Sequence, residues 1–154
     1  MKTLIALTAL LAAMAAPASD PPGFAMWTGS ELKAMTGKLA PKINEQKVAT
    51  QALGSFANHN LVMVHREGDG EAELHETTAD VFVVQSGAGV LVVGGKVVGG
   101  KTTAPGEVRG TSIAGGAKRK LVPGDVATIP ANTAHQVLVP AGQKITYLIV
   151  KVKK

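Results

Sequence analysis

The chain has 154 residues, a formal net charge of +5, no cysteine and 3% aromatic residues. That length is typical of a single domain, and the lack of cysteine excludes disulfide bonds, thiolate metal ligands and cysteine catalysis. The basic residues are scattered, whereas nucleic-acid-binding proteins concentrate basic charge and interleave aromatic side chains. We therefore expect one small domain that does not bind nucleic acid.

Residues 1–18 have the pattern of a secretory signal peptide. The positive residue Lys2 precedes the apolar run Leu4–Ala16, and Ala16-Pro17-Ala18 has the small residues of a cleavage site. The run is shorter than the roughly 20 residues of a membrane-spanning helix, which disfavours the alternative of a membrane anchor. We expect an exported protein, periplasmic or extracellular, that has no membrane attachment once the signal peptide is removed.

Residues 19–46 predict an irregular leader followed by a short helix. Ser30 is the expected N-cap, and Leu32, Met35 and Leu39 have helical spacing. Pro41 is expected to end or kink the helix, because proline lacks the amide hydrogen that a helix interior requires.

Residues 47–154 predict β-structure, because short β-branched segments alternate with Gly, Pro, Asn and Asp. Gly94-Gly95 predicts a hairpin turn, and the glycine-rich segment Gly99–Gly116 predicts a long loop. Many short strands at even spacing indicate an all-β barrel or sandwich. The expected strands are Val48–Leu53, Asn60–Arg66, Ala72–His75, Val81–Gln85, Val90–Val93, Lys96–Val98, Arg119–Val122, Val126–Ile129, His135–Val139 and Ile145–Val152.

One region concentrates side chains of the kinds that bind metals. Glu73 and His75 are two residues apart on an expected strand, so their side chains project from the same face. Asp80 begins the next expected strand and can point back toward that face. His135, much later in the chain, is a fourth candidate.

The spacing of these residues resembles the first sequence motif of the cupin superfamily. In that motif a His-x-His pair is followed by a glutamate after three or four residues and then, after six further residues, by a glycine. Here Glu73, His75, Asp80 and Gly87 stand at those positions. Glu73 replaces the first histidine, Asp80 replaces the longer glutamate, and the opening glycine is displaced, since Gly68 stands one residue too close to Glu73.

A second cupin motif is matched by Gly124, Pro130 and His135, which have the spacing that the family shows. Asn132 replaces a glycine of this motif, and asparagine tolerates the left-handed conformation that a glycine would supply. Val139 replaces the final asparagine. The resemblance therefore supports the fold more firmly than any one reaction.

The resemblance implies an all-β double-stranded β-helix barrel, of the cupin or jelly-roll type, over residues 47–154, with a short N-terminal helix before it. It implies a homodimer paired through edge strands. It also implies dioxygenase, isomerase, lyase or decarboxylase activity as alternatives, because one fold supports many reactions.

The same resemblance implies that Glu73, His75, Asp80 and His135 bind one divalent transition metal. Two imidazoles and two carboxylates suit Fe(II), Mn(II), Ni(II) or Zn(II), and the sequence does not choose among them. The alternative is a pocket without metal. Two buried carboxylates without a cation would be costly, unless they shared a proton or shifted their pKa values.

His65 and Phe82 are further candidates for the pocket. If a turn centred on Gly70 pairs the strands on either side of it, His65 lies opposite His75 and faces the same interior. A slip of one residue would point His65 outward. Phe82 is the one aromatic residue near the first motif.

Two functions remain open from the sequence, and whether the protein is an enzyme is undecided. One is a metalloenzyme that acts on a small oxygen-containing organic molecule. The other is a non-catalytic module that binds a metal or a small ligand. Arg66, Arg109 and Lys118 could receive an anionic substrate, although solvated surface charge explains them equally well.

Overall fold

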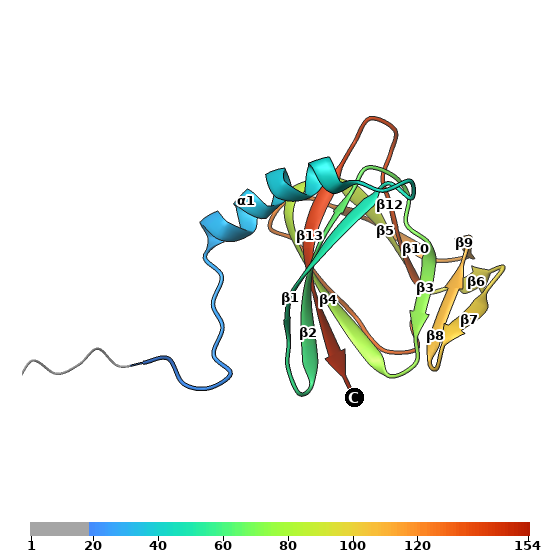
Figure 1. Ribbon diagram of the computed structural model, residues 1–154. Coiled ribbons are helices and arrows are strands. Elements are labelled where there is room, and N and C mark those ends of the chain that lie inside the picture. The colour runs from blue at the N-terminus through green and yellow to red at the C-terminus, as the bar shows by residue number, and fades with distance from the viewer. Residues whose placement is uncertain (1–18) are drawn as a thin grey trace, which may run out of the picture.

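The computed structural model describes residues 19–154, and the predicted signal peptide lies outside these residues. One α-helix, α1, and one short 3-10 helix, η1, precede a series of strands (Figure 1). No helix in residues 19–154 is long and apolar enough to cross a membrane. The elements are α1 (Gly29–Leu39), η1 (Ala40–Lys42), β1 (Val48–Ser55), β2 (His59–Arg66), β3 (Ala72–His75), β4 (Thr78–Gly87), β5 (Gly89–Val93), β6 (Lys96–Val98), β7 (Lys101–Ala104), β8 (Glu107–Gly110), β9 (Ser112–Ala114), β10 (Ala117–Leu121), β11 (Val126–Ile129), β12 (His135–Leu138) and β13 (Ile145–Lys153).

The helix begins two residues earlier than a cap at Ser30 would place it. Its N-cap is Thr28, whose Oγ1 accepts a hydrogen bond from the backbone N–H of Glu31 at 3.2 Å. The Glu31 carboxylate in turn accepts from the Thr28 backbone N–H at 2.7 Å. This reciprocal pair is a capping box, and it selects Thr28 because a glutamate stands three residues after it. The helix ends at Leu39, before Pro41, as expected.

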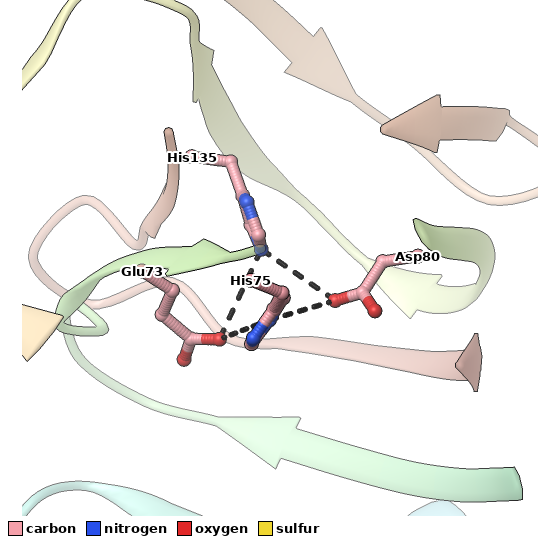
Figure 2. A group of neighbouring side chains, drawn as sticks. All are labelled: Glu73, His75, Asp80 and His135. Atoms are coloured by element: carbon pink, nitrogen blue, oxygen red, sulfur yellow. Dashed lines mark ion pairs between the residues drawn. The ribbon is translucent and has the colours of Figure 1, made fainter. Parts of the chain in front are cut away.

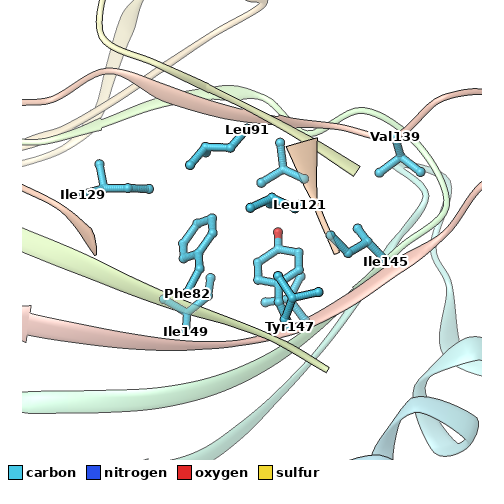
Figure 3. Packing of buried hydrophobic residues seen from close by; sticks show 11 residues of the cluster. Phe82, Leu91, Leu121, Ile129, Val139, Ile145, Tyr147 and Ile149 are labelled. Atoms are coloured by element: carbon cyan, nitrogen blue, oxygen red, sulfur yellow. The ribbon is translucent and has the colours of Figure 1, made fainter. Parts of the chain in front are cut away.

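Two antiparallel sheets face each other and enclose the core. The five-stranded sheet has the order β1-β2-β13-β4-β11, and the six-stranded sheet has the order β10-β5-β12-β3-β8-β7. Alternate residues of each strand point inward and fill the space between the sheets (Figure 3). The buried cluster consists of Val64, Phe82, Val84, Leu91, Leu121, Ile129, Val137, Val139, Ile145, Tyr147 and Ile149. The all-β prediction is confirmed.

Helix α1 packs against the outer face of the five-stranded sheet (Figure 1). Leu39 of the helix is fully buried there with Ala49 of β1 and Met63 of β2. Since side chains alternate along a strand, Val62 and Val64 face the interior between the sheets, while Met63 faces the helix.

The predicted loop at Gly99–Gly116 is wrong, because this segment forms β7, β8 and β9. Gly99, Gly106 and Gly115 have positive φ and lie in the turns before β7, between β7 and β8, and after β9. Every residue of β7 is exposed, so the segment lacks the apolar alternation from which a strand is predicted. Strand β8 pairs with β3 and so lies beside the predicted metal ligands.

The two predicted hairpins are also wrong in their pairing. Gly94 and Gly95 both have positive φ, but β5 pairs with β10 and β12, whereas β6 pairs with β9 in a separate two-stranded sheet. Strands β2 and β3 belong to different sheets. The backbone N–H of Gly70, between them, donates to the carbonyl of Val137 in β12, so this segment crosses from one sheet to the other.

Candidate metal centre

Four side chains predicted as metal ligands converge between the two sheets (Figure 2). Glu73 and His75 lie on β3, Asp80 on β4 and His135 on β12. One potential ligand atom from each residue lies within 4.8 Å of the others. Donors around a single zinc-sized ion are at most about 4.4 Å apart, twice a bond length of about 2.2 Å. The group is therefore slightly wider than a closed metal site.

The turn before β12 fixes the position of His135. Asn132 has a φ of 61°, the left-handed conformation expected where the family motif has glycine. Its backbone N–H donates to the carbonyl of His75 at 2.8 Å, which joins the turn to β3. In β12, His135 is then paired with Glu73 of β3.

His135 has one ring nitrogen that is satisfied and one that is not. Its Nδ1 lies 3.0 Å from the carbonyl oxygen of Thr133, and a carbonyl only accepts, so Nδ1 carries the hydrogen. Its Nε2 is buried without a hydrogen-bond partner, 3.5 Å from Oδ2 of Asp80 and 3.8 Å from Oε2 of Glu73. In the neutral imidazole this Nε2 presents a lone pair to two carboxylates, an arrangement that a bound cation would satisfy.

His75 is oriented in the same way by a residue that the sequence did not indicate. Its Nδ1 lies 2.7 Å from Oε2 of Glu107 in β8. A carboxylate that accepts from one ring nitrogen fixes the tautomer and directs the other nitrogen toward a metal. Nε2 of His75 lies 3.4 Å from both Glu73 Oε2 and Asp80 Oδ2.

Lys151 of β13 was missed by the sequence analysis and lies inside the group. Its Nζ donates to Oδ1 and Oδ2 of Asp80 at 3.1 and 3.0 Å. Nζ also lies 3.1 Å from Nε2 of His75 and donates to it whenever that imidazole is neutral. Its inward orientation could have been predicted, because side chains alternate along a strand and Lys151 follows the inward-facing Tyr147 and Ile149 at every second position.

Arg109 of β8 is a second positive group at the centre. Its Nη1 lies 2.9 Å from Oε2 of Glu73, and its Nη2 donates to Oε2 of Glu107 at 3.2 Å. The sequence analysis named Arg109 as a possible anion receptor but located it in a loop. Its position on β8, opposite Glu73, instead makes it a partner of the carboxylates.

These contacts shift the pKa values of three groups. Burial alone would raise the pKa of Glu73, but the hydrogen bond from His75 and the charge of Arg109 lower it to about 2. Burial likewise opposes the ionisation of Asp80, yet the neighbouring imidazoles of His135 and His75 and the charge of Lys151 hold its pKa well below the usual range. Burial disfavours the imidazolium of His75, but the bonds to Asp80 and Glu73 raise its pKa to about 9.

Three carboxylates at the centre therefore face three positive groups at neutral pH. The carboxylates belong to Glu73, Asp80 and Glu107. The positive groups are the His75 imidazolium, Arg109 and Lys151. The sequence argument that buried carboxylates require a metal was thus incomplete, because strands β8 and β13 supply cations of their own.

A cavity of about 170 Å³ adjoins this group. Phe82 lines it as predicted, and its ring stacks on Tyr147 with 4.9 Å between centroids and meets His135 edge-on at 6.1 Å. Glu71, Arg109 and Gln136 line both the cavity and a more open pocket of about 590 Å³, so the two adjoin each other.

His65 does not face this cavity, so its assignment to the pocket is wrong. His65 is two residues after Met63 on β2, so its side chain points to the same side, the outer face of the five-stranded sheet, where it is fully buried. Its Nδ1 bonds Oγ1 of Thr146 at 2.7 Å and its Nε2 bonds Oε1 of Glu67 at 3.3 Å. The pairing with His75 on which the prediction depended does not exist, since β2 pairs with β1 and β13.

Comparison by sequence identified no matching family model and no similar curated protein. Comparison by structure identified many similar proteins. A protein of Thermus thermophilus matches with a TM-score of 0.55 and 19% identity, over 76% of this chain and 92% of that one. A cupin-2 domain protein of Rhodospirillum rubrum matches with a TM-score of 0.52 and 21% identity, over 71% of this chain and 62% of that one.

The polyketide cyclase RemF of Streptomyces resistomycificus matches with a TM-score of 0.51 and 16% identity, over 71% of this chain and 67% of that one. The chain therefore spans about two thirds of the length of the cyclase and of the Rhodospirillum protein. At these identities the likeness concerns the fold. Together with the facing antiparallel sheets, it shows that this chain has the cupin fold that its two sequence motifs predicted.

Proposed function

We propose that the protein binds one divalent transition metal through Glu73, His75, Asp80 and His135 and acts on a small oxygen-containing molecule in the adjoining cavity. The observation that carries the metal site is the buried, unpartnered Nε2 of His135, directed at two carboxylates. Two nitrogen and two oxygen donors fit Fe(II), Mn(II), Ni(II) or Zn(II). Such an ion, when bound, supplies Lewis acidity toward an oxygen of the ligand.

A divalent ion can bind at the centre in exchange for positive charge that already lies beside the carboxylates. The His75 proton and the Lys151 ammonium together carry two positive charges, the same as a divalent ion. When His75 releases its proton to solvent and the Lys151 ammonium moves from Asp80 to the cavity wall, both His75 and Asp80 become available as ligands, and the net charge of the centre rises by only one. The Lys151 side chain is 26% exposed and lines the cavity, so it has space to move.

Other residues of the chain hold the ligands in position. The carbonyl of Thr133 and the carboxylate of Glu107 orient the two imidazoles. Arg109 keeps Glu73 ionised. Once displaced from Asp80, Lys151 would remain at the cavity wall, where an ammonium group can hydrogen-bond an oxygen of the substrate.

Catalysis is supported by the fold of an enzyme neighbour, a polyketide cyclase, although fold alone does not select a reaction. A second function, binding of a small ligand without turnover, is favoured by the internal cations. Lys151 and Arg109 neutralise the carboxylates and so keep the centre stable without a metal.

Metal titration tests the proposal. Chelator-treated protein is titrated with Zn(II), Mn(II), Ni(II) and, without oxygen, Fe(II), by calorimetry, and bound metal is then measured by elemental analysis after gel filtration. We expect one ion per chain for at least one metal, and no tight binding by His135→Ala. His59→Ala is the matched control, because His59 bonds only to Asn58 and stacks on Phe56, away from the centre. Equal stoichiometry in His135→Ala and the parent would contradict the proposal.

A further inference from the structure

A second polar group, distinct from the metal centre, lies on the cavity wall. Arg66 of β2 and Tyr147 of β13 both line the cavity. Nε of Arg66 donates to the phenol oxygen of Tyr147 at 3.0 Å. Among residues 19–154 no carboxylate forms an ion pair with Arg66, although Glu71 also lines the cavity. The guanidinium nitrogens beyond Nε are therefore free to bind a ligand.

Tyr147 adds a second donor at the same place. Its side chain is buried, and burial raises the pKa of the phenol, so the hydroxyl keeps its proton. The oxygen accepts from Arg66, and no residue in the described part of the chain accepts the hydroxyl hydrogen. Arg66 and Tyr147 thus present several hydrogens and no negative charge.

The backbone holds the Arg66 guanidinium against a glycine. A Cβ atom at Gly70 would lie 2.9 Å from Cζ of Arg66, so the planar group rests directly on the Gly70 backbone. Gly70 is itself fixed on β12, because its N–H donates to the Val137 carbonyl at 2.8 Å and its carbonyl accepts from Nε2 of Gln136 at 2.8 Å. The guanidinium is therefore preorganised, which reduces the entropy cost of binding a ligand.

The remaining cavity wall is largely apolar. Its apolar side chains are those of Val62, Val64, Phe82, Val137 and Ile149. A cavity of roughly 150 Å³ accommodates a molecule the size of benzene, so the volume of about 170 Å³ here suits a compact ligand of similar size.

We propose that this cavity binds a small organic anion whose carboxylate is held by Arg66 and Tyr147 and whose apolar body lies along the β-branched wall. A planar guanidinium matches a carboxylate in geometry as well as in charge. The ligand then extends toward Glu73, His135 and Lys151, which line the same cavity. This inference gives the chemical class of the substrate in the proposed function. It rests on that function only where the metal takes part, since Arg66 and Tyr147 bind the carboxylate without it.

Binding of a matched pair of probes tests the inference. Isovalerate and isovaleramide have nearly the same shape, but only the first carries a negative charge. Calorimetry or NMR titration of chelator-treated protein should show isovalerate binding at least about tenfold more tightly than isovaleramide, as expected for a charge-assisted bidentate contact. The same titrations with zinc-loaded protein show whether the metal adds to the affinity.

Three variants and one control variant assign the contact. Arg66→Gln should weaken isovalerate binding at least about tenfold and leave isovaleramide unchanged. Tyr147→Phe, which removes one neutral donor, should weaken it about fivefold. Arg119→Gln is the matched control, because Arg119 is exposed on β10 and bonds only to the carbonyl of Lys118. Arg66→Lys, which keeps the positive charge, should bind isovalerate more tightly than Arg66→Gln does. That result would show that Arg66→Gln weakens binding because the charge is lost and not because the protein is misfolded.

The outcomes separate this inference from the metal proposal. Isovalerate binding that needs Arg66 but occurs in a protein unable to bind metal supports the inference and contradicts the metal site. Isovalerate binding that needs zinc and is unaffected by Arg66→Gln overturns the inference and leaves the metal site intact. Equal affinity for the acid and the amide in the parent protein also overturns it.

Discussion

Two histidines buried to a similar extent lie in different regions, His65 on the outer face of the five-stranded sheet and His135 on the six-stranded sheet, directed into the space between the sheets. His65 is fully buried on the outer face, and both of its ring nitrogens have partners, on Thr146 and Glu67. His135 is 2% exposed on the inner side, and its Nε2 has none. Burial is therefore the same in the two regions, whereas the hydrogen bonding differs.

The difference separates a structural histidine from a candidate ligand. A buried polar atom without a partner is costly, and folded proteins rarely retain one unless a ligand, an ion or water satisfies it. His65 has no capacity left to bind anything further. His135 has one lone pair available, beside Asp80 and Glu73.

The largest expected effect is that replacing one histidine changes metal affinity, whereas replacing the other changes only stability. His135→Ala should weaken metal binding by roughly 100-fold or more, since four ligands of a zinc site together supply about 10–16 kcal/mol. His65→Ala should leave metal affinity unchanged but lower the free energy of unfolding by roughly 1–3 kcal/mol, because it leaves Thr146 without its buried partner. Calorimetry and urea denaturation measure the two effects.

The reverse pattern, loss of metal binding in His65→Ala with none in His135→Ala, would remove the basis of the comparison. Both variants are compared with His59→Ala, which should behave as the parent in both measurements, because the His59 contacts to Asn58 and Phe56 are at the surface.

A smaller effect is expected from the carboxylate behind His75. Glu107→Gln keeps the shape of the side chain but removes the charge that orients Nδ1 at 2.7 Å. Such outer partners typically contribute about 10–100-fold in metal affinity. Glu76→Gln is the matched control, because Glu76 is exposed just after β3. Unchanged affinity in Glu107→Gln would show that the backbone alone positions His75.

The inward face of the barrel could be predicted wherever its residues followed a known pattern. The i, i+2 spacing of Glu73 and His75 and the turn at Asn132 correctly predicted which side chains meet. Periodicity sufficed there, because side chains alternate strictly along a regular strand. Phe82 was named only as the aromatic residue near the first motif, and it lies on the cavity wall.

Pairing between distant strands could not be predicted in the same way. The assignment of His65 depended on a hairpin register, and a shift of parity by one residue reverses the face. Glu107 and Arg109 lie on β8, in a glycine-rich segment with exposed neighbours that give no strand signal. Lys151 resembled a solvated basic terminus. Alternation along β13 could have placed it on the inner face, but its contact with Asp80 depends on the pairing of β13 with β4.

Lys151→Met tests whether the internal ammonium competes with a metal. The substitution removes two charge-assisted bonds to Asp80, so the metal-free protein should lose stability while metal affinity rises about tenfold. Lys153→Met, at the exposed end of β13, is the control and should change neither. Weaker metal binding in Lys151→Met would mean that the ammonium assists the metal instead of competing with it.

The smallest expected effect is a pH dependence that changes sign when metal is added. The folded-state pKa of His75, about 9, lies above its ordinary value of 6.5, so the protonated ring stabilises the metal-free protein fully below about pH 6.5 and loses that contribution as the pH rises through 9. The melting temperature of metal-free protein should therefore fall by a few degrees over this interval.

A bound metal requires the deprotonated ring, so the stabilisation that zinc adds should grow over the same interval. Thermal unfolding at fixed ionic strength, with zinc and with a chelator, measures both slopes. In His135→Ala the falling slope should persist, because Glu73 and Asp80 still lie 3.4 Å from His75, while the zinc-dependent rise should disappear. Parallel slopes with and without zinc in the parent would show that no metal reaches the His75 nitrogen, and Lys151 and Arg109 would then be the permanent cations of the centre.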